Sequence, residues 1–585
     1  MKKILYKILA VSLLVSGCEL ERLPNDAYTD TTIKEDPETT LDVLLNGNYS
    51  TMRSVYDTYI RFGEYRSDNV RKDKPTTAGY SIFYTWDRNP SAGTPNSQWN
   101  NCYKVISQAS EIIKMFSEGT SAVLDQSLGE AYYQRGLMYF NLVNMFGRPY
   151  YQDPGTNLGV PIVNGMPEEG VSNYEFPDRS TVKEVYAQIV SDFRKAEQLC
   201  NTYSPIRGSK ESAQAALAKA YIYMSGTFES PDKLYADSAY YYADQVIKSG
   251  KFQLLSRENF MRYNEFSPED ATQTETIFAC RTRFEDVSSR LASQLGGQFS
   301  RIQNVGWGET CASSIAIDLL NEEGTNDWRK GHGDLSGIVD ARAAFVVPDY
   351  ELSDENDPSS TRRAFLFVIK VYDNSGAATG YTYKQFVPSQ VGASGELISV
   401  KDEATGTEYP VKAIDLANRK YSIRYNNETY AGYDDLYVNE SMGYPRYYVY
   451  RCSLEEGNTQ QHSPVVARLA DVMLIRAEAS IKLGNLPAAL QDLNAVRERA
   501  IPQHGYQSLD PSNAKERLLK ERHLELMFHG DRTLDVFRVG ESLSRPMPGW
   551  CGDPFRTMKP TDPDVVMYIP SQQIEAWPTK LTQNP

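Results

Sequence analysis

The sequence predicts a mostly α-helical protein with a loop-rich middle region that contains short β-hairpins. From about residue 40 to 250, apolar residues recur every three or four positions, which is the helical period. Between residues 260 and 460 this period fades, and clusters of Gly, Asp and Tyr separate short β-rich pieces such as AFLFVIKVY and RYYVYR. The helical period returns at residue 465.

The composition restricts the class of protein. A chain of 585 residues is too long for one compact core and suits two or more domains or one large helical assembly. The formal net charge of −15 argues against a nucleic-acid-binding protein, which would need a basic face. The 40 Tyr against 21 Phe suit surfaces that bind a hydrated ligand, and core or interface packing is the alternative use of these rings.

The first eighteen residues, MKKILYKILAVSLLVSGC, indicate export. Three lysines precede an apolar run over residues 8–15, which is too short to span a membrane. The stretch LVSGC resembles a lipobox, in which Cys18 is acylated and becomes the first residue of the mature chain. An ordinary secretory signal with an incidental cysteine is the alternative. Glu19 and Glu21 resemble the pattern that sends some lipoproteins to the outer face of the outer membrane.

Helices are predicted in the first half from segments of regular apolar period. Their sequences are WNNCYKVISQASEIIKMF, SLGEAYYQRGLMYFNLVNMFG, STVKEVYAQIVSDFRKAEQL, SKESAQAALAKAYIYMSG and LYADSAYYYADQVIKSG. Gly147, with Pro149 after it, is predicted to end the second helix, and Ser180 to cap the third. Gly250 closes the series. The alanine stripe of the fourth segment lets a neighbouring helix approach closely.

The C-terminal half begins its helices with VVARLADVMLIRAEASIKLG. Gly484 is predicted to stop this helix, Asn485 to cap the next one, and Pro487 to fit its first turn. Apolar residues that follow Gly484 by five, nine and twelve positions fit the turn and second helix of a tetratricopeptide unit. Such a helix pair cannot bury its apolar stripe alone, so we expect it to stack on others.

The stretch ERHLELMFHGDRTLDVFRVG, residues 521–540, is dense in charge and histidine. On a helix, His523 and His529 would point about 240° apart, so they could not chelate one ion together. Gly530 is expected at a C′ position, and Asp531 is expected to cap the following helix. We interpret this stretch as a brace, in which charged groups tie two helices to their neighbours, rather than as a reaction centre or metal site.

The cysteines indicate no metal site and no redox pair. An exported chain could oxidise them, but their gaps are wide and irregular, and neither a C-x-x-C pair nor a zinc spacing is present. We therefore expect mostly buried free thiols among the cysteines that follow Cys18, which are Cys102, Cys200, Cys280, Cys311, Cys452 and Cys551.

Four blocks of this sequence resemble the SusD/RagB family of lipoproteins, and the resemblance covers most of the mature chain. They are LGEAYYQRGLMYFNLVNMFGRPYY, the VRERA that follows ALQDLN, the stretch 521–540, and YIPSQQIEAWPTKLTQNP at the end. The blocks occur in the family's order behind a lipobox, and this combination is more specific than any single block.

The resemblance implies a scaffold of about four tetratricopeptide-like helix pairs, with a loop-rich half that carries the ligand site. It implies a lipid-anchored, surface-exposed protein of the outer membrane that binds oligosaccharides. Such a protein delivers them to a SusC-like TonB-dependent transporter, without catalysis and without a cofactor. The expected divisions are a signal peptide (1–17), a tether (18–40), an N-terminal helical domain (41–280), and a C-terminal domain (281–585) with loop-rich (281–460), helical (461–540) and final (541–585) parts.

Two other functions remain open from the sequence. The first is peptide capture of the RagB type. The second is glycoside hydrolysis, which needs two carboxylates at a set distance. With 76 acidic residues such a pair can always be found, but no nucleophile elbow, H-E-x-x-H motif or phosphate loop is present. A structural calcium could lie in the Asp-rich stretch ELSDENDPSS, although EF-hand spacing is absent.

A sugar site needs aromatic platforms for C–H faces and side chains that bond the hydroxyl rim in fixed directions. The stretch YRSDNVRKD supplies polar groups, FYTWDRN supplies aromatic rings, and Trp307 stands between two glycines in the loop-rich half. For each tryptophan, a packed core ring is the alternative. Asp327 and Arg329 resemble a family Asp-x-Arg pattern that we interpret as structural. The predicted ligand contacts are Asp68, Asn69, Arg71, Tyr84, Trp86 and Trp307.

Overall fold

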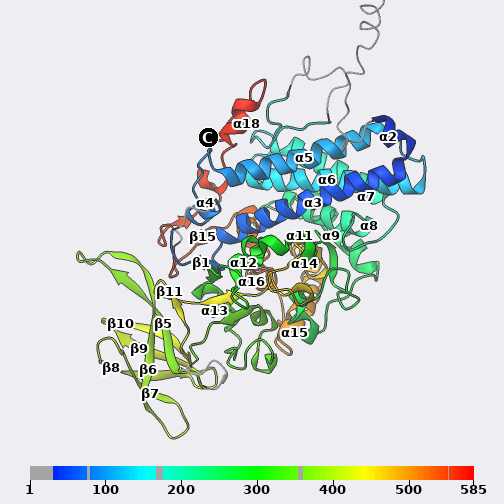
Figure 1. The fold of residues 1–585 in the computed structure, drawn as a ribbon. Helices are drawn as coiled ribbons and strands as arrows, with labels where there is room; N and C mark the ends of the chain where they lie inside the picture. The colour runs from blue at the N-terminus through cyan, green and yellow to red at the C-terminus, as the bar shows by residue number, and fades with distance from the viewer. Residues whose placement is uncertain (1–29, 76–78, 166–175, 353–359, 551) are drawn as a thin grey trace, which may run out of the picture.

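The protein consists of a large helical body and a smaller β-barrel that projects from it (Figure 1). This computed structural model describes residues 30–75, 79–165, 176–352, 360–550 and 552–585. Cys18 of the lipobox, Cys551, and most of the candidate calcium loop (353–359) lie outside the described residues. Within them, no helix combines the length and the apolar character that crossing a membrane requires. The predicted helical fold is confirmed.

The first half of the chain forms long helices that pack side by side in the body. The helices predicted there are present as α5 to α9, and Gly147 caps the end of α6 as expected. The bounds are α2 (Asp30–Glu35), α3 (Pro37–Tyr65), α4 (Ser81–Thr85), α5 (Gly93–Met115), α6 (Ala122–Phe146), α7 (Val182–Leu199), α8 (Lys210–Met224) and α9 (Lys233–Lys248).

The cap of α7 differs from the prediction by one residue. Thr181, not Ser180, is the N-cap. Its hydroxyl accepts a hydrogen bond from the Glu184 backbone N–H at 3.2 Å, and the Glu184 carboxylate accepts one from the Thr181 N–H at 2.8 Å. The glutamate three residues downstream therefore selects Thr181, because only this spacing forms the reciprocal capping box.

The second half contributes shorter helices around the long pair α14 and α15. Gly484 ends α14 in a left-handed conformation with φ of 85°, and Asn485 caps α15, both as predicted. The bounds are α10 (Arg257–Phe260), α11 (Phe284–Val287), α12 (Leu295–Phe299), α13 (Ser314–Leu320), α14 (Leu469–Leu483), α15 (Leu486–Ala500), α16 (Ala514–Glu525), α17 (Arg532–Arg538) and α18 (Ser571–Ala576). Short 3-10 turns are η2 (Tyr263–Glu265), η3 (Ser288–Ser293), η4 (Leu335–Gly337), η5 (Ala341–Phe345), η7 (Glu455–Gly457) and η8 (Pro563–Val565).

The middle region forms a closed antiparallel barrel, where we expected only short hairpins. Its strand order is β10-β5-β6-β7-β8-β9. Inward-facing residues such as Phe365, Phe367, Phe386, Tyr421 and Ile423 give the barrel a core of its own, and filling this core requires closure. The strands are β5 (Arg363–Tyr372), β6 (Ala378–Val391), β7 (Leu397–Lys401), β8 (Glu408–Asp415), β9 (Lys420–Tyr425) and β10 (Glu428–Leu436).

Outside the barrel, the described strands form two-stranded pairs, several of which join distant parts of the chain. β1 follows the first long helix and pairs with β3, so that Arg71 lies opposite Cys311. This pairing brings the two regions predicted to bind ligand next to each other. The pairs are β1 (Val70–Lys72) with β3 (Thr310–Ala312), β2 (Thr276–Ala279) with β14 (Val465–Arg468), β4 (Val346–Pro348) with β13 (Tyr447–Val449), β11 (Glu440–Ser441) with β12 (Tyr444–Pro445), and β15 (Leu543–Ser544) with β16 (Thr557–Met558).

The charged stretch 521–540 lies in the interior of the body. The Arg522 guanidinium donates to the carboxylate of Asp535 at 2.8 Å, and Arg538 donates to Glu478 at 2.7 Å. Glu525 accepts a hydrogen bond from Arg499 at 2.6 Å. These buried pairs connect α16 and α17 to α14 and α15, which supports the interpretation of this stretch as a brace.

Two details of this stretch differ from the prediction. Asp531 stands at the N-cap of α17, but its carboxylate binds the Lys219 ammonium at 2.7 Å and makes no capping hydrogen bond. A buried lysine is a stronger partner for a carboxylate than a backbone N–H. Gly530 has φ of 86° but lies beyond the end of α16, against Ile60 of α3.

Two smaller predictions concern cysteines and an Asp-x-Arg pattern. Arg329 donates two hydrogen bonds of 2.7 Å to the Asp327 carboxylate, as expected for a structural pair. The prediction of buried free thiols is confirmed for the described cysteines, which are Cys102, Cys200, Cys280, Cys311 and Cys452.

Candidate functional site

Asp68 and Asn69, predicted to bond sugar hydroxyls, are buried under the brace. The Asp68 carboxylate accepts two hydrogen bonds from Arg532, each 2.9 Å long. The Asn69 amide donates to Glu64 at 2.9 Å, and its oxygen lies 2.6 Å from Nε2 of His523. Burial places both side chains among permanent protein partners, so a direct contact with ligand does not fit their position.

Arg71 is fully buried on β1. Its guanidinium donates to the Asp73 carboxylate and to the backbone carbonyl of Pro445, which lies beside the barrel. Because Arg71 is buried and its two terminal nitrogens join the helical body to Asp73 and strand β12, it serves the fold and is not open to a ligand.

The predicted platforms Tyr84 and Trp86 are core rings. Tyr84 stacks on Tyr65, with ring centroids 4.4 Å apart. Trp86 packs edge-on against Phe537 at 5.6 Å, and the Arg66 guanidinium covers it at 4.1 Å. With 1% of Tyr84 and 6% of Trp86 exposed, neither ring has a free face for a sugar. The alternative of a packed core ring therefore describes both residues better.

Trp307 is the predicted site residue that the structure leaves open, with 62% of it exposed. Its loop is well anchored, because the Trp307 N–H donates to the Gly297 carbonyl at 2.6 Å. The flanking Gly306 and Gly308 have φ of 98° and 56°. A Cβ on Gly308 would lie 2.6 Å from the ring of Tyr448, so this turn requires glycine. Trp307 therefore remains a predicted aromatic platform for a ligand, because its ring is exposed and its loop is anchored.

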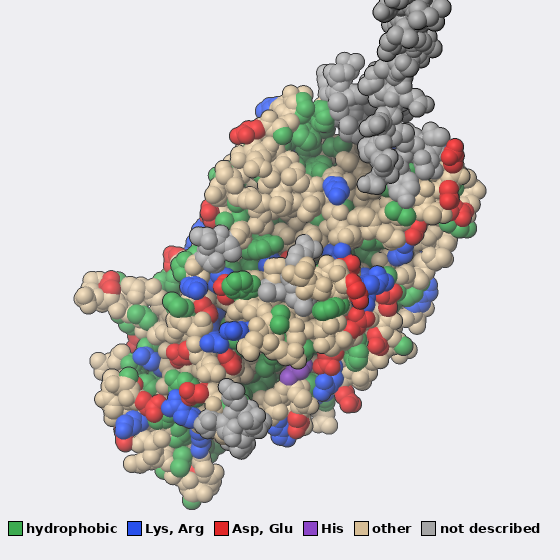
Figure 2. Space-filling model, viewed as in Figure 1, with side chains coloured by type: hydrophobic (Ala, Val, Ile, Leu, Met, Phe, Trp, Pro, Cys, Tyr) green, Lys and Arg blue, Asp and Glu red, His purple; other side chains and the backbone are tan. Residues whose placement is uncertain are grey.

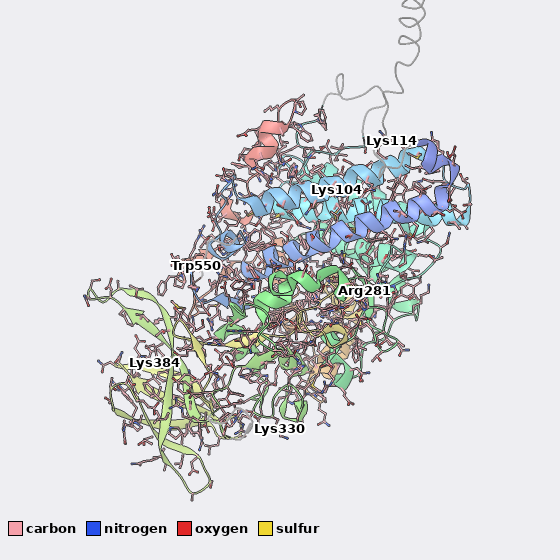
Figure 3. All side chains as sticks on the ribbon, viewed as in Figure 1. Lys104, Lys114, Arg281, Lys330, Lys384 and Trp550 are labelled. Atoms are coloured by element: carbon pink, nitrogen blue, oxygen red, sulfur yellow. The ribbon has the colours of Figure 1, made fainter. Side chains whose placement is uncertain are left out.

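A second tryptophan, Trp550, lies where the helical body meets the barrel (Figure 3). Its backbone N–H donates to the Lys72 carbonyl at 2.7 Å, and Lys72 forms an ion pair with Glu309 at 2.8 Å. The contacts link Trp550 through β1 to the segment that carries Trp307. The half-buried Trp550 is therefore connected to the segment that contains Trp307.

A polar cleft of about 400 Å³ opens beside α12, and we call it the α12 cleft. Figure 1 shows α12 next to α3, and the cleft lies between these helices and the start of α5. Its lining residues are Ser50, Arg53, Ser54, Asp57, Thr58, Tyr80, Ser97, Asn101, Thr282, Val287, Ser293, Gln294, Leu295, His462 and Pro464.

Helical spacing places the polar side chains of the cleft in two stripes. Ser54 and Thr58 are four residues apart on α3, and Ser97 and Asn101 are four apart on α5, so each pair lies on one helix face. The start of α12 is held in place because the Leu295 N–H donates to the Asp57 carboxylate at 3.1 Å. The parts of the wall that come from α3, α5 and α12 are therefore fixed by helical structure.

Several side chains of the α12 cleft have hydrogen-bonding capacity to spare. Ser54, Thr58, Ser97 and Asn101 make no side-chain hydrogen bond within the described part of the chain. The Tyr80 hydroxyl is likewise unpaired there, and its half-buried ring forms part of the wall. Hydroxyl and amide groups both donate and accept, so this set can bond a ring of ligand hydroxyls.

Charges in the α12 cleft are neutralised inside the protein. Arg53 pairs with Asp286, and Asp57 pairs with Arg61 at 2.9 Å. Burial, reinforced by the nearby Arg451 guanidinium, lowers the pKa of His462 to about 3, so its imidazole is neutral near pH 7. In the described residues, no three His, Cys, Asp or Glu side chains are grouped to hold a metal ion.

None of the predicted ligand contacts lines the α12 cleft. Tyr80 lies between the two stretches from which ligand contacts were predicted. The paired serine, threonine and asparagine positions at helical spacing were the available signal. That signal is weak, because exposed helix faces are commonly polar.

The fold and the cleft define a helical scaffold protein with a β-barrel and a solvent-open polar cleft, whose Arg53 and Asp57 side chains are paired within the protein. Residues 20–222 match the SusD-like family described as "Starch-binding associating with outer membrane", and residues 274–584 match the SusD family. The chain belongs to the SusD family.

Known relatives and solved structures span nearly the whole chain. SusD-like protein P38 of Formosa agariphila is 23% identical over 512 residues, covering 85% of this chain and 82% of the relative. SusD-like protein P2 of the same species is 24% identical, with 92% and 91% covered. A SusD superfamily protein from Bacteroides thetaiotaomicron has a TM-score of 0.67 at 22% identity, with 94% and 99% covered. A SusD-like carbohydrate binding protein from Bacteroides vulgatus has a TM-score of 0.57 at 16% identity, with 87% and 84% covered.

Proposed function

We propose that this protein is a cell-surface lipoprotein that binds oligosaccharides in the α12 cleft and passes them to a SusC-like TonB-dependent transporter of the outer membrane. It performs no catalysis in this role, and Cys18 carries its lipid anchor. The observation that carries the proposal is the set of unpaired hydroxyl and amide groups beside the Tyr80 ring in an open cleft. Family membership supports it, because the matched family is described as starch-binding and associated with the outer membrane.

Sugar chemistry explains why this cleft suits a glycan. A pyranose has flat C–H faces that pack on aromatic rings and a rim of hydroxyls that need partners in fixed directions. Tyr80 supplies a half-buried ring, over one face of which the Arg61 guanidinium lies 4.1 Å from the centroid. Ser97 and Asn101 supply neutral donors and acceptors. Trp307 adds a further exposed ring, on a loop whose backbone is bonded to Gly297 of α12.

In this proposal the helical scaffold supports the segments that form the cleft. The helix pairs from α6 to α9 and from α14 to α15 act as a tetratricopeptide-like frame on which the cleft segments rest. We further propose a division into an N-terminal domain (41–280) and a C-terminal domain (281–585), and the two family matches, 20–222 and 274–584, support a boundary in that region.

Binding measurements on a glycan panel test the proposal. Calorimetry with the wild-type protein should identify a bound oligosaccharide, and Tyr80→Ala or Asn101→Ala should each weaken its affinity at least about tenfold, or about 1.4 kcal/mol. Tyr241→Ala is the matched control, because this ring is 54% exposed on α9, outside the cleft. Capture of peptides from a protein digest without any glycan binding would favour the RagB-type alternative.

Anchoring, transport and the absence of catalysis need separate tests. Cys18→Ala should move the protein from the membrane fraction to the soluble fraction, and an unchanged distribution would contradict lipid attachment.

Purification of the wild-type protein from its own membranes should bring a TonB-dependent transporter with it. Incubation with a bound oligosaccharide should create no new reducing ends, and their appearance would revive glycoside hydrolysis.

A further inference from the structure

We propose that the α12 cleft selects uncharged glycans and rejects both acidic and amino-sugar chains. This inference rests on the proposed function, because it names the class of glycan that the same cleft binds. It is carried by the charge pairing and the neutral donor set of the lining.

The two formally charged side chains of the lining are already used. Arg53 pairs with Asp286 and also donates to the Ser50 hydroxyl at 2.9 Å. Asp57 accepts from Arg61 at 2.9 Å and from the Leu295 N–H at 3.1 Å. Neither residue offers an unpaired charge to a ligand. The face of the molecule in Figure 2 shows the same tendency, with acidic and basic side chains next to one another.

An acidic sugar would enter this cleft at a cost. Carboxylate and sulfate groups are recognised through unpaired guanidinium or ammonium donors. To engage Arg53, such a group would have to displace Asp286, which would then lose its own partner. Without that exchange, the anion would lose water and gain only neutral partners. The net charge of −15 adds a long-range repulsion at low salt.

An amino sugar meets the opposite problem. Its ammonium would need a free carboxylate, and the Asp57 carboxylate is held by Arg61 and by the backbone of α12. Taking Asp57 away from these partners would also loosen the wall of the cleft. A cation therefore gains no more from this lining than an anion does.

The unpaired groups that remain are all neutral. The hydroxyls of Ser54, Thr58 and Ser97 and the amide of Asn101 can each donate and accept, as sugar hydroxyls can. His462 adds a neutral imidazole, whose ring makes no hydrogen bond within the described residues. These neutral donors and acceptors can bond the hydroxyls of an uncharged glycan. Binding such a glycan leaves no charged group in the cleft without a partner.

A matched glycan panel tests the selection. The wild-type protein is titrated with neutral oligosaccharides of glucose, xylose and mannose, with oligogalacturonides, with sulfated galactan oligosaccharides and with chitosan oligosaccharides of equal length. We expect at least one neutral oligosaccharide to bind ten times or more tightly than every charged one. Tighter binding of a charged oligosaccharide would overturn the inference and leave the proposed function standing. If no glycan binds, the proposed function fails and this inference fails with it.

A variant that frees a cation tests the mechanism of selection. Asp286→Asn removes the partner of Arg53 at a carboxylate that is 42% exposed, so the fold should tolerate it. We expect affinity for oligogalacturonides to rise at least tenfold, while affinity for the neutral ligand changes less than threefold. Asp564→Asn is the control, because it frees Arg556 from a surface pair outside the lining of the cleft. No gain with Asp286→Asn would contradict the role of charge pairing.

A second variant places an anion among the neutral groups. Asn101→Asp changes shape little but introduces an unpaired carboxylate, so affinity for chitosan oligosaccharides should rise at least tenfold at pH 7. Asn427→Asp in an exposed turn of the barrel makes the same change in net charge and should have no effect. Thermal unfolding of both variants checks that they fold. Unchanged affinity in a folded Asn101→Asp protein would remove this residue, and the neutral-lining argument, from the site.

Discussion

Arg532 donates two hydrogen bonds to Asp68, a residue 464 positions earlier in the chain. Both bonds are 2.9 Å long, one from Nε and one from Nη2, so the guanidinium engages both carboxylate oxygens. The pair joins the segment after α3 to the start of α17. It unites a predicted ligand contact with the predicted brace, and its burial gives both residues a structural role.

The first prediction is that Arg532→Ala lowers the free energy of unfolding by about 3 kcal/mol. Removing one partner of a buried ion pair leaves the Asp68 carboxylate desolvated without compensation. Chemical denaturation measures the loss, and glycan affinity should stay within a factor of two. Arg556→Ala breaks the exposed pair with Asp564 and should cost less than about 1 kcal/mol. An unchanged melting temperature with lost glycan binding would show instead that Arg532 acts in the site.

The second prediction uses two glycines of α3. A Cβ on Gly63 would lie 1.8 Å from the carbonyl oxygen of Gly530, so Gly63→Ala must force α3 away from the brace. We expect a loss of at least about 3 kcal/mol in unfolding free energy, which is in the range of severe overpacking. A Cβ on Gly47 of the same helix meets nothing within 4 Å, and Gly47→Ala should stabilise the protein by about 0.5–1 kcal/mol. Equal effects of the two changes would contradict this close contact.

The third prediction separates the two tryptophans that the sequence placed in one site. Trp86→Ala removes a buried ring from beside Phe537 and should lower unfolding free energy by about 3–5 kcal/mol. Trp307→Ala removes a largely exposed ring, so stability should change by less than about 0.5 kcal/mol while glycan affinity falls. Denaturation and calorimetry on both variants give the comparison. Wild-type affinity in Trp307→Ala would exclude this ring from the site.

Much of the helical fold was predictable, because helix signals are local. Gly484 and Asn485 end and begin helices through their own backbone and side-chain chemistry, and the structure places both as predicted. The barrel was not predictable in the same way. Its closure depends on the pairing of β5 with β10, two strands that are far apart in the sequence, and no local residue pattern records that partner.

The candidate site was harder to predict for a related reason. An aspartate, asparagine or tryptophan can serve a ligand or the core, and only the tertiary partner decides which. Asp68 is not available to a ligand because it is paired with Arg532, and Trp86 is not available because it packs against Phe537. Tyr80 and Asn101 became lining residues because α3, α5 and α12 meet around them. None of the six predicted contacts lines the α12 cleft, whose residues are brought together by the packing of helices that are far apart in the sequence.

The last prediction concerns acid stability and His523. Burial, together with Arg532, lowers the pKa of His523 to about 3, although Asp68 opposes this shift. The unfolded chain protonates this residue near its ordinary pKa of about 6.5. Between these values the unfolded state therefore binds one more proton, and stability falls as pH falls, by up to about 1.4 kcal/mol per pH unit.

His523→Gln removes this titration but keeps a donor for the Asn69 oxygen, which lies 2.6 Å from Nε2 in the wild type. Urea unfolding at pH 7, 5.5 and 4.5 should show a smaller loss of stability in the variant than in the wild type. Burial also lowers the pKa of His462 and His529, so the variant should retain part of the slope. Parallel curves for the two proteins would mean that His523 takes up its proton without unfolding, and that the contact with Asn69 is not maintained in solution.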